Sequence, residues 1–148
     1  MSSIHRLAIR VGSLILLIPV VLLAACSTTG STASVPTEAA AFHTTAKTTD
    51  DQFVVQLTVT PNRLGLNHFI VMVDASSGKP APTMQAQLST TMLDMDMGTD
   101  QIGLQPNGHG QYSAQGTLSM AGHWEIRILL RTPDASLHVA SVELDTTA

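Results

Sequence analysis

Residues 52–144 alternate between apolar and polar side chains with a period of two, and short turns interrupt the alternation at regular intervals. The clearest run spans residues 123–131 and has its apolar side chains at Trp124, Ile126, Ile128 and Leu130. A period of two places successive side chains on opposite faces of a β-strand, whereas a helix needs apolar residues three or four positions apart. The pattern therefore predicts strands with one face in a core.

Seven such segments follow one another, and turns rich in Gly, Pro, Asn and Ser separate them. The segments are residues 52–60, 67–74, 83–92, 100–105, 111–118, 123–131 and 137–144. The second is apolar on both faces, so we expect it at the centre of a sheet. Short strands at this spacing, with no helical pattern among them, predict an all-β fold: a seven-stranded antiparallel immunoglobulin-like β-sandwich over residues 52–145.

The N-terminal 25 residues have a different character. Arg6 and Arg10 precede an apolar run from Val11 to Ala25, which is shorter than the roughly 20 apolar residues that a membrane-spanning helix needs. A basic start, a short apolar run and small residues at its end predict a secretory signal peptide over residues 1–25.

Leu23-Ala24-Ala25-Cys26 resembles the lipobox of bacterial lipoproteins, and Cys26 is the single cysteine of the chain. The resemblance implies cleavage before Cys26 and lipidation of that residue, and several acyl chains together give stable membrane anchoring. The alternative is an ordinary signal peptide followed by a stray thiol. Residues 26–51 are rich in Ser, Thr and Ala, which predicts a flexible tether behind the lipidated cysteine. We therefore expect an exported protein, anchored to a bacterial membrane at its outer face or in the periplasm.

The charge balance excludes one class of partner. Loss of the signal peptide leaves five of the seven basic residues against all eleven acidic ones. An acidic protein is repelled by the phosphate backbone, so we expect no nucleic-acid partner. The chain also lacks the short motifs of serine hydrolases, zinc proteases and phosphate-binding loops, and we expect no enzymatic activity.

Residues 92–98 read Met-Leu-Asp-Met-Asp-Met-Gly and hold three of the seven methionines. Thioethers are soft, neutral ligands that suit Cu(I). Met95 and Met97 are two positions apart, so an extended backbone would put both on one face, whereas Met92 shares the parity of the core position Leu88. We predict a Cu(I) site formed by Met95, Met97, Met92 and His109.

Other interpretations of these residues stay open. His109 belongs to the turn that closes the next hairpin, and His123, beside Met120, is a second source of an imidazole. The methionines are otherwise ordinary packing residues, because Met fills irregular gaps in cores. An oxygen-rich calcium loop starting at Asp94 fits in its first positions but has Thr99 where the loop needs Gly and Gln105 where it needs Glu.

Five short pieces, in this order along the chain, resemble the YtkA-like domain family. They are residues 61–69 (PNRLGLNHF), 78–80 (GKP), 92–98 (MLDMDMG), 110–112 (GQY) and 120–124 (MAGHW). The resemblance runs from about Phe53 to Leu144. It implies a β-sandwich outside the cytoplasm, similar to the C-terminal part of some bacterial copper-import proteins and distantly to FixH. The family's methionine motif often has Pro after the first Met; Leu93 stands there and does not fix φ as Pro would.

Two functional hypotheses follow. In the first, a membrane-anchored domain binds Cu(I) or hands it over, with a copper transporter or an oxidase-assembly protein as its partner. In the second, the domain binds no metal and is a protein-interaction module that docks on a membrane partner.

Overall fold

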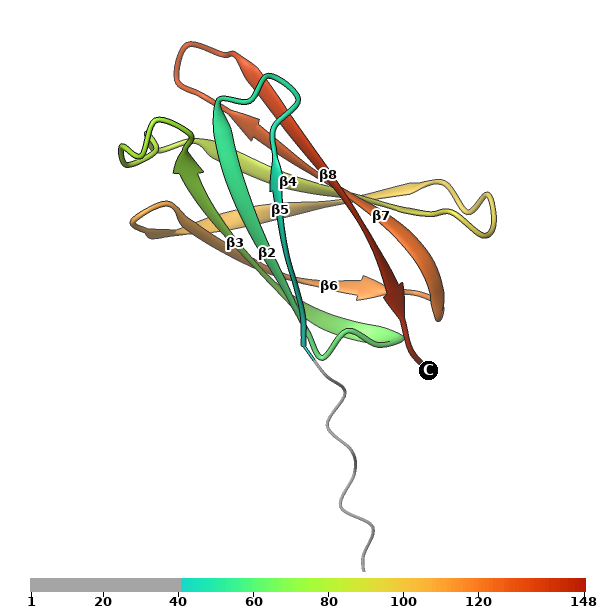
Figure 1. Ribbon diagram of the computed structural model, residues 1–148. Helices are drawn as coiled ribbons and strands as arrows, with labels where there is room; N and C mark the ends of the chain where they lie inside the picture. Colours follow the sequence, from blue (N-terminus) through green and yellow to red (C-terminus); the bar gives the residue numbers. More distant parts are fainter. Residues whose placement is uncertain (1–40) are drawn as a thin grey trace, which may run out of the picture. The chain divides into compact units, whose positions relative to one another are not determined.

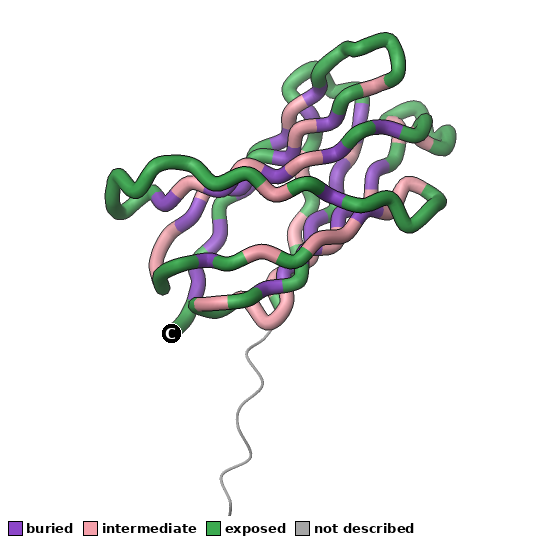
Figure 2. The backbone as a smooth tube through the Cα atoms, turned by 180° about the vertical axis from the view of Figure 1, so that it is seen from behind, coloured by how far each residue is buried: buried purple, intermediate pink, exposed green. Residues whose placement is uncertain are grey.

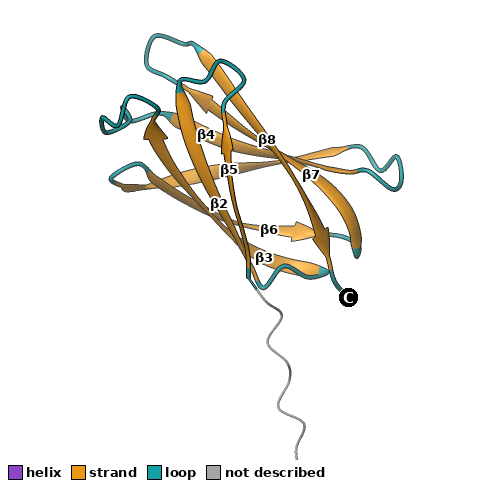
Figure 3. Cartoon of the chain, in the orientation of Figure 1, coloured by secondary structure: helices purple, strands orange, loops and turns teal. Residues whose placement is uncertain are grey.

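The computed structural model describes residues 41–148, and the predicted signal peptide and Cys26 lie outside this range. The described residues form eight β-strands and no helix (Figures 1 and 3). The strands are β1 (Phe42–Lys47), β2 (Phe53–Thr60), β3 (Gly65–Ala75), β4 (Gln85–Met92), β5 (Thr99–Gly108), β6 (Gln111–Leu118), β7 (Gly122–Arg131) and β8 (Leu137–Thr146). The predicted all-β class is confirmed, with eight strands in place of seven.

All neighbouring strands pair antiparallel, in the order β1-β2-β3-β6-β5-β4-β7-β8. The strand β5 joins the two halves of this arrangement. Its residues 99–104 pair with β4, and its residues 105–108 pair with β6, with a shift of register between Pro106 and Gly108. The sheet therefore folds over on itself, with β1, β2, β3 and β6 on one side of the core and β4, β7 and β8 on the other (Figure 1).

Two backbone hydrogen bonds bring the edges of the sheet together. The Thr49 amide donates to the Val139 carbonyl over 2.8 Å, and the Leu64 amide donates to the Thr147 carbonyl over 2.7 Å. Both bonds link the β1–β3 region to β8, one beside each end of that strand. They leave the sheet nearly closed, which limits the unpaired edge available for pairing with another chain.

The predicted alternation is confirmed strand by strand. In β2 the side chains at Phe53, Val55, Leu57 and Val59 are buried, and the residues between them are less buried or exposed. Buried and less buried positions alternate along much of the backbone (Figure 2). The same period of two runs through β4, β7 and β8. The strand β3 lies between β2 and β6, as its two apolar faces predicted. Burial of a large apolar side chain is worth about 1.5–3 kcal/mol, so these inward positions dominate the stability of the fold.

The segment expected to be a tether contributes the eighth strand, which corrects the predicted boundary at residue 51. Phe42–Lys47 pairs with β2 along its whole length. Its inward positions, Phe42, Thr44 and Ala46, are only half-buried, and its outward positions are polar. An edge strand of this composition buries little apolar surface, and its alternation is too weak to recognise in the sequence.

Antiparallel pairing sorts the connections between strands into two groups at opposite ends of the sheet. One end, the methionine end, holds the start of β1, the β2–β3, β4–β5 and β6–β7 connections and the end of β8 (Figure 1). The other, the far end, holds the β1–β2, β3–β4, β5–β6 and β7–β8 connections. This sorting decides which candidate site residues can meet.

Candidate functional site

The β4–β5 connection, Leu93–Gly98, forms a loop that we call the methionine loop. The Met97 amide donates to the Met95 carbonyl over 3.1 Å, which closes a tight three-residue turn. The expectation of an extended backbone here is therefore wrong. Met95 and Met97 are the first and third residues of this turn, and Gly98, at φ +79°, leads the chain into β5.

The three methionines of this segment divide into one core residue and two surface residues. Met92, the last residue of β4, is 5% exposed and belongs to the core. Met95 and Met97 are 52% and 50% exposed. A large apolar side chain gains only part of its burial energy at such positions, so core packing alone does not account for Met95 and Met97.

The start of β7 holds the methionine loop in place. The Leu93 amide donates to the His123 carbonyl, and the His123 amide donates to the Asp94 carboxylate, each over 2.8 Å. Gly122 makes this close approach possible. A Cβ atom at Gly122 would lie 2.6 Å from Asp94 Oδ2 and 2.7 Å from Met92 Cε.

The backbone of His123 contacts the methionine loop, but its imidazole interacts with β8. Its Nδ1 lies 2.8 Å from Asp145 Oδ1, and its Nε2 lies 3.3 Å from Glu143 Oε2. Hydrogen bonds to Asp145 first and Glu143 second raise the pKa of His123 above its ordinary value of 6.5. Both ring nitrogens thus have carboxylate partners, and a soft metal at this position would have to displace one of them.

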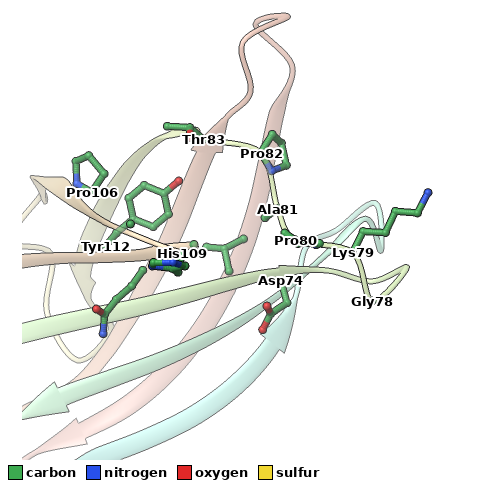
Figure 4. Close-up of a pocket in the computed structure, with 14 residues that line it drawn as sticks. Asp74, Gly78, Lys79, Pro80, Ala81, Pro82, Thr83, Pro106, His109 and Tyr112 are labelled. Carbon is green, nitrogen blue, oxygen red and sulfur yellow. The ribbon is translucent and has the colours of Figure 1, made fainter.

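His109 lies at the far end and is not brought to the methionines. The ten residues of β5 separate its turn from the methionine loop, a distance of roughly 30 Å at the rise of a β-strand. His109 instead lines a cavity of about 630 Å³ with Asp74, Lys79 and Tyr112 (Figure 4). A single site containing Met95, Met97 and His109 does not form within one domain.

A further methionine shares the methionine end. Met120, in the β6–β7 connection, is 36% exposed. Its carbonyl accepts hydrogen bonds from Trp124 Nε1 over 3.2 Å and from Thr146 Oγ1 over 3.1 Å, which anchor this connection to β7 and β8. Three partly exposed thioethers therefore lie on two neighbouring connections, and the third was recognisable in the sequence only as a neighbour of His123.

Sequence reasoning missed two exposed apolar residues at the same end, Leu64 and Leu66. The signal for Leu66 was its parity, which is opposite to that of the buried Phe69. Asn67 orders the connection before β3: its Oδ1 accepts from the Arg63 amide, and its Nδ2 donates to the carbonyls of Arg63 and Gly65. This buried amide fixes the connection that carries Leu64, and Leu66 is exposed because it lies on the outward face of β3.

The alternative of a calcium loop starting at Asp94 is not supported by a cluster of ligands in the described residues. Among the His, Cys, Asp and Glu side chains of residues 41–148, no three come together where they could hold a metal ion. One oxygen of Asp94 is already bonded to the His123 amide.

The described residues also include no helix long and apolar enough to span a bilayer.

Comparison with known proteins identifies the family of this domain. Searches of curated proteins and of solved structures found no match to the chain. The sequence model of the YtkA-like family matches residues 45–129, from β1 to β7. Because the match covers more than half of the 148 residues, the chain belongs to the YtkA-like family.

Proposed function

We propose that this protein is a lipoprotein, exported and anchored through Cys26, whose YtkA-like domain binds Cu(I) weakly at Met95 and Met97 and hands it to a membrane partner. The observation that carries the metal proposal is the exposure of both thioethers on a loop that hydrogen bonds to the start of β7 hold in place. Exposed sulfur ligands on a fixed loop suit a soft cargo ion that must be both taken up and released.

The donor set favours transfer over storage. Thioethers are neutral and need not lose a proton, so binding does not compete with protonation. Met120 on the neighbouring connection supplies a third candidate sulfur. The imidazole of His123 is engaged with Asp145 and Glu143. A site with two or three soft ligands and no free imidazole leaves coordination positions that a partner protein would fill.

Cu(I) titration under anaerobic conditions tests the metal proposal. The protein should begin at Ser27, because the Cys26 thiol would itself bind Cu(I). We expect that Met95→Leu combined with Met97→Leu weakens binding at least tenfold, about 1.4 kcal/mol. Exchange of exposed Met for Leu should change stability by less than about 0.5 kcal/mol.

The matched control is Met72→Leu, which replaces a half-buried methionine of β3 that pairs with Gln111 near the far end. It should leave Cu(I) binding unchanged. Equal affinity in the wild type and the double variant would reject the metal site. The exposed apolar residues at the methionine end would then favour the second candidate, a docking module without metal.

The anchor has its own test. We expect Cys26→Ser to move the protein from the membrane fraction to the soluble exported fraction, because one thiol carries the lipid. Metabolic labelling with a radioactive fatty acid should mark the wild type and not the variant. Labelling of both proteins would place the lipid elsewhere.

A further inference from the structure

The exposed large apolar side chains of the described residues gather at the methionine end. Seven such side chains are at least 36% exposed, and six of them lie at this end, five on its connections and Leu66 at the start of β3. We call these six the apolar rim: Leu64, Leu66, Leu93, Met95, Met97 and Met120. The seventh, Leu137, begins β8 at the far end. The methionine end therefore has an apolar surface, whereas the far end has one exposed large apolar side chain among the described residues.

The exposure of the apolar rim is imposed by the fold. Asn67 fixes the connection that carries Leu64, and hydrogen bonds to His123 fix the methionine loop. The Met120 carbonyl is bonded to Trp124 and Thr146. These connections cannot fold inward to bury their side chains without breaking the bonds, so the apolar surface remains available to another surface.

The chain enters the sheet at the same end. The first strand begins at Phe42, which pairs with Val59 near the end of β2. Residues 27–41 separate Cys26 from this point and span at most about 50 Å when fully extended. If Cys26 carries the lipid, as the proposed function requires, the apolar rim belongs to the end of the domain that is tied to the membrane.

We propose that the apolar rim docks on the lipid bilayer, so that the methionine loop lies at the membrane surface and the far end points away from it. The inference rests on the lipid anchor of the proposed function but not on copper binding. A short tether raises the effective concentration of the bilayer around the domain, so a weak apolar contact is enough to orient it. A metal ion released from Met95 and Met97 would then be released at the membrane surface, close to a membrane partner.

Charge determines which lipids favour this contact. Asp94, Asp96, Asp100 and Asp145 are exposed at the methionine end, against the guanidinium of Arg63 and the imidazole of His123. Carboxylates are repelled by anionic headgroups, and the repulsion is screened by salt. The contact should therefore be apolar in origin, strongest on zwitterionic lipid and weaker when anionic lipid is added.

Site-specific fluorescence on the full lipidated protein tests the orientation. Once Cys26 is acylated the chain has no free thiol, so Leu66→Cys and Leu137→Cys each introduce a unique labelling site. Each labelled protein is reconstituted into phosphatidylcholine vesicles whose acyl chains carry bromine, which quenches on contact. We expect severalfold stronger quenching at position 66 than at position 137, and a smaller difference when phosphatidylglycerol replaces half of the lipid. Leu93→Cys provides a second probe on the apolar rim and should behave like Leu66→Cys.

The outcomes separate this inference from the anchor on which it rests. Flotation of the protein with the vesicles reports the lipid anchor alone. Loss of flotation would reject both the anchor and the docking of the apolar rim. Flotation with equal quenching at positions 66 and 137 would reject docking and leave the anchor standing. Self-quenching of the label at position 66 in vesicles of unbrominated lipid, lost when the protein is diluted within the membrane, would assign the apolar rim to a second copy of the chain and would also overturn bilayer docking.

Discussion

Asp50 links the first hairpin of the sheet to its last strand. Its Oδ1 accepts from the Thr48 hydroxyl over 2.7 Å and from the Gln52 amide over 3.3 Å, and its Oδ2 lies 2.5 Å from Nδ1 of the buried His138. The hydrogen bond from Thr48 is the largest of the effects that lower the pKa of Asp50 to about 2, against the opposing effect of burial. His138 in turn packs edge-on against Phe53, with ring centroids 4.8 Å apart.

These contacts predict a defined pH dependence. Because the folded state lowers the pKa of Asp50, its stabilising effect is present above pH 3.8 and is lost as pH falls towards 2. We expect Asp50→Asn to lower stability at neutral pH and to flatten the decline over this range. Denaturant unfolding at a series of pH values measures it. Asp51→Asn is the control, because the exposed pair of Asp51 with Lys47 contributes little. An unchanged decline in Asp50→Asn would show that Asp50 is not the titrating group, and an equal flattening in the control would show that the effect is not specific to it.

Among single elements, the methionine loop shows how a neighbouring strand determines loop position. The sequence placed Met95 and Met97 on an extended backbone, but hydrogen bonds to His123 draw the loop against β7 and bend it. Gly122, at φ +144°, supplies both the space and the backbone conformation that this packing needs. The position of the two thioethers therefore depends on a residue that is distant in the sequence.

Substitution at Gly122 tests this dependence. Gly122→Ala should lower stability by about 1–3 kcal/mol and displace the loop, because its Cβ would overlap Asp94 and Met92. Hydrogen exchange at the Leu93 amide, which is bonded to His123, should become faster. Gly103→Ala in β5 is the matched control, since no atom lies within 4 Å of its added Cβ. Unchanged protection of the Leu93 amide in Gly122→Ala would contradict the role given to Gly122.

For the molecule as a whole, near closure of the sheet depends on β1. This strand covers the edge of β2, and its Phe42 and Ala46 pack against the core. The loop after it bonds to β8 through Thr49. The folded domain therefore begins before residue 48, although the predicted sandwich began at residue 52.

Two truncated chains test this boundary. A protein that starts at Ala41 should unfold at the same denaturant concentration as one that starts at Ser27. A protein that starts at Thr48 should lose roughly 2–4 kcal/mol, because several backbone hydrogen bonds worth about 0.5–1.5 kcal/mol each disappear with β1. It should also aggregate through the bare edge of β2. Equal unfolding midpoints for the chains starting at residues 41 and 48 would show that β1 is dispensable.

The sequence by itself determined the class of fold, the inward face of the long strands and the family. These features are local, because a period of two survives in any antiparallel arrangement and short motifs keep their order along the chain. Only the tertiary structure decided that β1 is a strand, that His109 lies away from Met95 and Met97, and that Leu66 shares an end with them. Those facts depend on which strands pair and on which connections lie at the same end of the sheet. Pairing is settled by contacts between residues far apart in the chain, whose combined burial no single segment reveals.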